Sequence, residues 1–323
     1  MAAFIVRRLL EAIPVLFFVS VAVFSMVQLL PGDPVRSLIP VGDQTVDPVA
    51  YEEQVQRVRR EYGLDDPVPI QYVRWLGKAM TGDLGTSIAT RQEVSSMIAN
   101  RLPVTVSIGL ITLVISLMVA IPAGVIAAVK RNTWIDHLAT FLSLSTVAMP
   151  GFWFGMLLIL VFVVWLDWLP GPGSYVKLWE DPARSFKLSI LPAVALSGFS
   201  TAALMRLTRS SMLEVLAQDY VRTARAKGLA ESTVIVRHAI RNAALPVVTF
   251  FGLQAIFLFA GSVIIERLFA IPGAGAMAVD AVFSRDFPVI QGFVLVSATI
   301  VVLMNVLVDI LYGLLNPLVR ASR

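Results

Sequence analysis

The chain of 323 residues has no cysteine and only two histidines. Without cysteine it has neither a disulfide framework nor thiol chemistry. His137 and His238 lie far apart in the sequence, and neither belongs to an H-E-x-x-H pattern, so zinc catalysis is not indicated. We therefore expect no catalytic residue and no metal site in this chain.

A phosphate-binding loop is also missing. The sequence contains no G-x-x-x-x-G-K-[ST] pattern, and its one Gly-Lys pair, Gly77-Lys78, is followed by Ala79. The long apolar stretches of the sequence also carry no paired ionisable residues near their centres. A proton-coupled pump usually needs such residues near the middle of the membrane. We therefore expect no cofactor in this chain.

Charge is scarce and unevenly distributed. Only 15% of the residues are charged and 57% are hydrophobic, with a mean hydropathy of +0.79, well beyond a soluble globular domain. A membrane-spanning helix needs about 17–25 apolar residues. Six charge-free runs meet this length: Ala12–Gly32, Leu102–Val129, His137–Leu166, Leu188–Met205, Asn242–Ile265 and Phe287–Val308. The sequence predicts an all-α integral membrane protein with six transmembrane helices.

Basic residues in the short loops set the expected orientation. Arg7-Arg8, Lys130-Arg131 and the cluster from Arg206 to Arg241 all fall on one side of the six runs. Because cytoplasmic loops are enriched in Lys and Arg, we expect the N and C termini in the cytoplasm. This bias also explains the isoelectric point near 9.6 without a nucleic-acid partner.

The pattern of runs also predicts the domain organisation. The first run is followed by Pro31-Gly32-Asp33-Pro34 instead of a small-x-small cleavage pattern, so it is interpreted as a retained span. A charged helix over Tyr51–Gly63 is either a cap on the outer mouth of the bundle or a contact surface for an external partner. The expected segments are an N-terminal transmembrane helix (1–32), an external, periplasmic helical cap region (33–101), a core domain with the other five transmembrane helices (102–316) and a cytoplasmic tail (317–323).

The most distinctive segment is a polar interruption, Asp219–Arg241, between two apolar runs. Each of its charges would cost about 2.5–3.5 kcal/mol at the bilayer centre, so it must lie outside the membrane. In a helix, Tyr220, Ala224 and Gly228 share a face on which small side chains allow another surface to approach closely. Gly228 can end that helix in a left-handed conformation. The segment 206–242 is either a docking device or a solvated loop.

Resemblance to a known family favours docking. Residues Asp219–Leu229, followed by Arg237–Pro246, resemble the cytoplasmic coupling motif of ABC-importer membrane subunits, specifically the first-permease branch of the dipeptide, oligopeptide and nickel transport family. The general motif begins Glu-Ala-Ala, whereas this chain has Arg222-Thr223-Ala224 and keeps the later glycine at 228. Further similar segments are Leu30–Pro34, Tyr62–Pro67, Gly82–Ser87, and Glu266 with Phe269, Pro272, Gly273 and Gly275.

The resemblance implies a type I importer bundle in the bacterial cytoplasmic (inner) membrane, forming half of a translocation pathway. The implied partners are a homologous second permease, two cytoplasmic ABC ATPase subunits that bind ATP and Mg, and an extracytoplasmic substrate-binding protein. The implied ATPase-coupling residues are Asp219, Tyr220, Arg222, Thr223, Ala224, Arg225, Lys227 and Gly228. The implied outer-gate loop, a re-entrant turn, contains Glu266, Phe269, Pro272, Gly273 and Gly275.

Other interpretations stay open. Within this family the cargo could be di- or oligopeptides, nickel, glutathione or another small solute. A self-contained secondary transporter would need no ATPase, and an intramembrane enzyme would need a nucleophile and a base at depth. Two details of the helices can also be predicted: Pro122, Pro150 and Pro192 kink their spans, and Gln28, Gln254 and Asn305 hydrogen-bond between helices instead of binding substrate.

Overall fold

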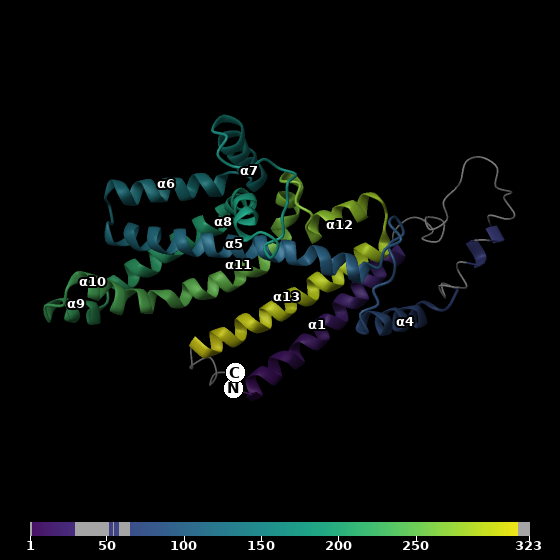
Figure 1. The fold of residues 1–323 in the computed structure, drawn as a ribbon. Helices are drawn as coiled ribbons and strands as arrows, with labels where there is room; N and C mark the ends of the chain where they lie inside the picture. Colours follow the sequence, from purple (N-terminus) through teal and green to yellow (C-terminus); the bar gives the residue numbers. More distant parts are fainter. Residues whose placement is uncertain (1, 30–51, 54, 58–64, 316–323) are drawn as a thin grey trace. The chain divides into compact units, whose positions relative to one another are not determined.

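The computed structural model describes residues 2–29, 52–53, 55–57 and 65–315, and all regular elements in these ranges are helices (Figure 1). The motif Leu30–Pro34, most of Tyr51–Gly63 and the predicted tail 317–323 lie outside the described residues. The helices are α1 (Ala2–Leu29), α4 (Val68–Met80), α5 (Val94–Val129), α6 (Trp134–Ala148), α7 (Gly151–Ile159), η1 (Leu160–Trp165), α8 (Pro182–Leu216), α9 (Asp219–Ala226), α10 (Glu231–Thr233), η2 (Val234–Ile240), α11 (Arg241–Leu268), α12 (Ala274–Phe283) and α13 (Phe287–Leu315).

The apolar helices agree with the prediction of six spans. Helices α1, α5, α8 and α13 are each long and apolar enough to cross a membrane. Two bent pairs supply the others: α6 with Gly151–Trp165, at 106°, and Glu231–Ala244 with Pro246–Gln254, at 53°. The second pair coincides with the predicted run Asn242–Ile265 from Asn242 to Gln254, and its first part, Glu231–Arg241, belongs to the charged segment expected outside the membrane. Counting each pair as one span gives six.

The run His137–Leu166 is broken more severely than predicted. We expected one helix kinked at Pro150, but α6 ends at Ala148 and α7 begins at Gly151. Proline lacks an N–H group and disfavours the helical conformation of the residue before it, and Met149 accordingly has φ −90° and ψ 133°. Pro122 and Pro192 lie inside the uninterrupted helices α5 and α8.

Contacts within the chain define two units. The first contains residues 1–102 and 277–303, and the second contains 103–276 and 304–323. In the first unit α4 packs along α1: the Ser20 and Tyr72 hydroxyls lie 2.7 Å apart, and the Phe24 ring contacts those of Tyr72 and Trp75. The Gln28 side chain donates to that of Gln71 at 3.2 Å, which confirms its predicted interhelical bond.

The first unit also joins the segment before α5 to the turn between α12 and α13. The Asp286 carboxylate, only 2% exposed, accepts a hydrogen bond from the Ser87 hydroxyl at 2.5 Å. It also accepts hydrogen bonds from the backbone N–H groups of Ile88 and Ala89, at 3.1 and 3.2 Å. The Gly82–Ser87 motif is thus held at its end by a carboxylate far away in the sequence.

In the second unit α8 is central and contacts α6, α7 and α11 (Figure 1). Its buried residues include many small ones, among them Ala193, Ser197, Gly198 and Ala202. Small residues let membrane helices approach closely. Accordingly, a Cβ atom added at Gly124 of α5 would lie 2.7 Å from the Met205 carbonyl oxygen of α8.

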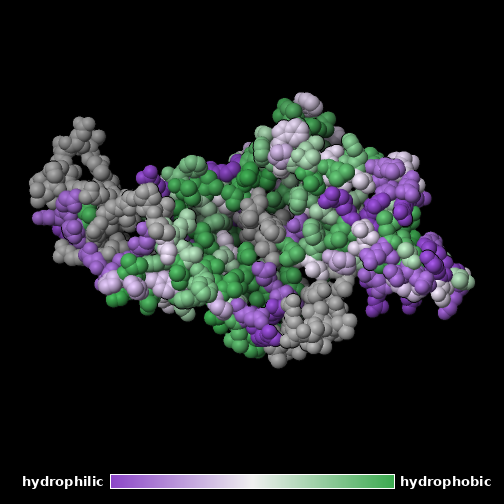
Figure 2. All heavy atoms as spheres, turned by 180° about the vertical axis from the view of Figure 1, so that it is seen from behind, coloured by the Kyte–Doolittle hydropathy of each residue, from purple (hydrophilic) through white to green (hydrophobic). Residues whose placement is uncertain are grey.

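The surface of the second unit is divided by polarity. Hydrophilic side chains gather over the end that carries α9 and α10, whereas hydrophobic side chains cover much of the surface beside it (Figure 2). Exposed large hydrophobic residues on this unit include Met118, Phe141 and Leu144. Such an apolar surface suits contact with lipid, and the polar end suits contact with water.

Candidate functional site

The predicted coupling segment forms a short helix at one end of the second unit. Helix α9 follows α8 after only Ala217 and Gln218, and it lies beyond the end of α8 (Figure 1). Gly228 has φ +78°, and its N–H donates to the Arg225 carbonyl at 2.9 Å. The predicted helix and its left-handed termination at Gly228 are therefore both confirmed.

The inner face of α9 is apolar and buried. Val221, fully buried, and Ala224, 7% exposed, pack with Val234, Val215 and Leu216. Ala224 therefore points into its own chain and not toward the open face on which we expected it. A helix of eight residues is not stable alone, so packing of its apolar side holds it in place.

The outer face of α9 is polar. Tyr220 is 42% exposed, and its hydroxyl accepts a hydrogen bond from the Asn242 side chain at 2.8 Å. Arg225 donates to both carboxylate oxygens of Glu231, at 2.7 and 3.1 Å, and this guanidinium holds the pKa of the Glu231 carboxyl below its ordinary value. The other predicted coupling residues are all exposed: Asp219, Arg222, Thr223, Lys227 and Gly228.

The predicted outer-gate loop is built around a buried carboxylate near the end of α11. Glu266 is 1% exposed, and it accepts hydrogen bonds from the Thr105 hydroxyl at 2.6 Å and the Ala276 N–H at 2.8 Å. The Thr105 oxygen also accepts the Ala274 N–H at 2.9 Å. One carboxylate and one hydroxyl thus fasten the start of α12 to α11 and α5.

The two glycines of this loop make room for that carboxylate. A Cβ atom at Gly273 would lie 2.2–2.5 Å from the carboxyl atoms of Glu266, and one at Gly275 would lie 3.0 Å from Glu266 Oε2. Phe269 is buried beside Leu191, and its carbonyl accepts the Gly173 N–H at 3.3 Å. Pro272 is exposed. The loop residues are therefore close together, and Thr105 is the partner that sequence reasoning missed.

A cavity of about 570 Å³ lies beside the break between α6 and α7. Helices α6, α7, α8 and α11 line it, and none of its described lining residues is charged. Polar groups come from Thr146, Ser200 and Gln254. Gln254, expected to bond between helices, thus lies on the cavity wall. The sequence did not indicate the cavity because the break at Pro150 was expected to be only a kink.

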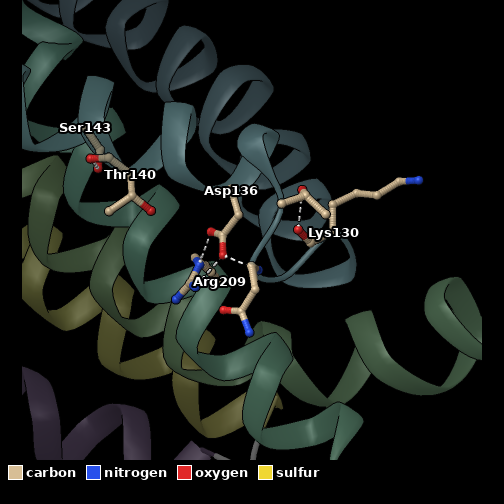
Figure 3. A network of polar contacts seen from close by, with 7 residues as sticks. Lys130, Asp136, Thr140, Ser143 and Arg209 are labelled. Atoms are coloured by element: carbon tan, nitrogen blue, oxygen red, sulfur yellow. Dashed lines mark hydrogen bonds and ion pairs between the residues drawn. The ribbon is translucent and has the colours of Figure 1, made fainter.

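An ion pair that sequence reasoning also missed joins α6 to α8 near the turn after α5 (Figure 3). Arg209 donates to the two carboxylate oxygens of Asp136 at 2.6 and 2.8 Å, and the Asn132 N–H donates to the same carboxylate at 3.0 Å. The sequence predicts a short loop at Lys130–Asp136 and places Arg209 in the basic cluster from Arg206 to Arg241. It therefore indicates no ion pair between these two residues. In the described ranges no group of three or more His, Cys, Asp or Glu is placed to hold a metal ion.

Comparison with known proteins gives a consistent result along the whole chain. Residues 120–321 match the family described as "binding-protein-dependent transport system inner membrane component", and residues 1–109 match its N-terminal region. A putative peptide transport system permease protein of Brucella abortus is 43% identical over 320 residues, 99% of each chain. A di/tripeptide transport system permease protein of Pseudomonas aeruginosa is 41% identical over the full length of both chains. A glutathione transport system permease protein of Escherichia coli is 41% identical over 99% of both.

Proposed function

Because this chain belongs to the family of inner membrane components of binding-protein-dependent transport systems, we propose that it is the first permease subunit of an ATP-driven importer of di- or oligopeptides. It forms half of the pathway together with a homologous second permease. Two ATPase subunits supply ATP and Mg chemistry, and an extracytoplasmic binding protein delivers cargo. The chain itself is a transport subunit and not an enzyme.

The observation that supports this proposal most is the construction of α9. It is a short polar helix outside the apolar body, fixed from behind by Val221 and Ala224 and closed by Gly228. Because α9 is packed against its own chain on one side and exposed on the other, a partner that displaces its exposed side would also displace α8. We propose that Tyr220, Arg222, Thr223 and the neighbouring polar residues contact the ATPase, with Ala224 supporting the helix from within.

The orientation of the chain follows from the same segment. Lys130 and Arg131 follow α5 at the end of the unit that also carries α9 (Figure 1). If α9 contacts ATPases, this end is cytoplasmic, and the enrichment of Lys and Arg in cytoplasmic loops supports the same orientation. The loop containing Glu266 and Gly273 would then lie on the outer side, and both chain termini would be cytoplasmic.

The cavity is our candidate for this chain's share of the cargo pathway. Its walls are apolar apart from hydroxyl and amide groups, which can hydrogen-bond to the amide groups of a peptide without selecting its side chains. None of its described lining residues is His, Asp or Glu, so it offers no preferred side-chain ligand for bare nickel. This favours an amide-containing solute over a metal ion.

Narrowing the cavity is expected to block transport. Ile264 lines it and is 59% exposed, so the indole of Ile264→Trp can extend into the space without displacing buried neighbours. We expect peptide uptake to fall at least about tenfold, a loss that corresponds to roughly 1.4 kcal/mol. Val114→Trp, at an α5 position that is 53% exposed and does not line the cavity, is the control. Equal uptake by the two variants would contradict the cavity's assignment.

Uptake in whole cells tests the cargo. A strain lacking this chain and the same strain complemented with it are given radiolabelled dialanine, trialanine, glutathione and nickel in separate assays. We expect the complemented strain alone to accumulate the alanine peptides, and accumulation to stop when ATP is depleted. Restoration of nickel uptake alone would reject the peptide cargo, and uptake driven by an ion gradient without ATP would favour a secondary transporter.

A further inference from the structure

We propose that the ion pair between Asp136 and Arg209 is a positioning link, through which movement of α9 reaches the wall of the cavity formed by α6 and α7. This inference rests on the function proposed above, because it assigns the pair a part in coupling. The pair lies outside the α9 contact surface and away from the residues that line the cavity.

The geometry of the pair fixes two helices against each other. Both oxygens of the Asp136 carboxylate accept hydrogen bonds from the Arg209 guanidinium, at 2.6 and 2.8 Å. A two-point contact of this kind fixes orientation as well as distance. The Asn132 N–H, from a residue at φ +61°, donates a third hydrogen bond to the same carboxylate. The Asp136 side chain is only 2% exposed, so separation would leave a charge buried without its partner.

Along the two helices, the ion pair lies between α9 and the part of α6 that reaches the cavity. Arg209 is about two helical turns before the end of α8 at Leu216, and α9 begins at Asp219. Asp136 is about three turns before Thr146, where α6 reaches the cavity. A displacement of α9 that moves α8 would reach α6 through the packing between the two helices, and the ion pair is the directional contact in that packing, close to the end that carries α9.

Other contacts between α6 and α8 are less restrictive. In the described part of the chain, the hydrogen bonds between these helices are those of the ion pair. The Ser143 hydroxyl is directed to the Thr140 carbonyl of its own helix, and the Thr146 hydroxyl to Leu142 (Figure 3). Ala139 of α6 packs against a cluster that includes Leu204 and Met205 of α8, and a Cβ atom added at Gly198 of α8 would lie 3.0 Å from the Thr146 methyl carbon. These apolar contacts bring the two helices close together but have no preferred direction. The ion pair therefore supplies the directional restraint.

Breaking the pair should uncouple ATP hydrolysis from uptake. For D136N and R209Q we expect the importer to assemble and to hydrolyse ATP, while uptake of labelled alanine peptides falls about tenfold. R209K retains the charge but not the two-point contact, so an intermediate uptake is expected. The charge swap D136R/R209D is expected to recover part of the uptake lost by either single change. Asp66→Asn, which breaks an exposed ion pair with Arg74 (2.7 Å), is the matched control and should leave uptake unchanged.

The distance between the helices provides a readout that does not depend on cargo. The chain lacks cysteine, so spin labels can be placed at Leu144→Cys on α6 and Ser210→Cys on α8, both exposed. In the purified complex we expect one narrow label-to-label distance that is the same with and without a non-hydrolysable ATP analogue. In D136N we expect that distance to broaden or to shift with nucleotide. If the D136N variant does not assemble, peptide uptake and the label-to-label distance are measured in R209K instead, and these two results test the proposal.

The possible failures are distinguishable. Absence of ATPase subunits from the unmodified preparation would overturn the proposed function itself. An assembled D136N complex whose label distance and uptake match those of the unmodified complex would overturn only the link. A charge swap no better than either single variant would also overturn it, because a directional link should respond to restored pairing.

Discussion

Gly228→Tyr is expected to reduce uptake severely while leaving the protein inserted in the membrane at a normal level. Gly228 has φ +78°, and a Cβ atom there would meet no other atom within 4 Å. The substitution therefore creates backbone strain of about 1–2 kcal/mol but no collision inside the chain. A large ring on the exposed end of α9 would obstruct a partner that approaches this helix, so we expect a loss of at least about tenfold in uptake.

Gly82 offers a matched control for that strain. It has φ +87°, and a Cβ atom there also meets nothing within 4 Å, but it lies in the segment after α4, far from α9 in the sequence. Gly82→Tyr should lower thermal stability about as much as Gly228→Tyr, yet retain uptake. Thermal unfolding in detergent and peptide uptake in cells measure the two effects separately. Equal loss of uptake in both variants would mean that strain alone explains the result.

Gly273→Ala should damage the loop around Glu266. The new Cβ atom would lie 2.2–2.5 Å from the Glu266 carboxyl atoms, so the carboxylate would have to move. Because the Glu266 side chain is 1% exposed and hydrogen-bonded to Thr105 and Ala276, moving it breaks hydrogen bonds in the protein interior. We expect destabilisation of about 2–4 kcal/mol and loss of uptake. Thermal unfolding of the purified protein measures the first effect.

Gly109→Ala is the control for Gly273→Ala, because a Cβ atom at Gly109 meets nothing within 4 Å and alanine favours the α5 helix. A double-variant cycle gives a sharper test of the collision. Glu266→Ala removes the group that Gly273→Ala would strike, so the double variant should be less destabilised than the two single changes added together. Strict additivity would show that the collision with Glu266 is not the cause.

The features that the sequence predicted well rest on strong local signals. Charge-free runs of membrane length identified the spans, because charged residues are costly in lipid. The helix at Asp219–Ala226 and its end at Gly228 followed from helical spacing and from the freedom of glycine to adopt positive φ. The motif containing Glu266, Gly273 and Gly275 was recognised as a unit, and the close approach of these residues gives it a physical cause.

Features that depend on contacts between segments far apart in the sequence could not be predicted. The helical period showed that Ala224 shares a face with Tyr220, but not that Val234 would cover it. Thr105 and Glu266 meet only because α5 and α11 are neighbours. The signal available for the ion pair was an acidic residue at the start of an apolar run, since such a residue near lipid needs a partner. Its partner, Arg209, lies 73 positions away in the chain.

The most direct test of the central claim is recovery of the intact assembly. The tagged chain is purified in mild detergent from its own membranes, and the proteins that accompany it are identified. We predict a second permease and ATPase subunits in stable proportion, with the ATPases lost from the Gly228→Tyr preparation and kept in Gly82→Tyr. A stable complex without ATPases would contradict the claim that α9 couples this permease to ATP hydrolysis.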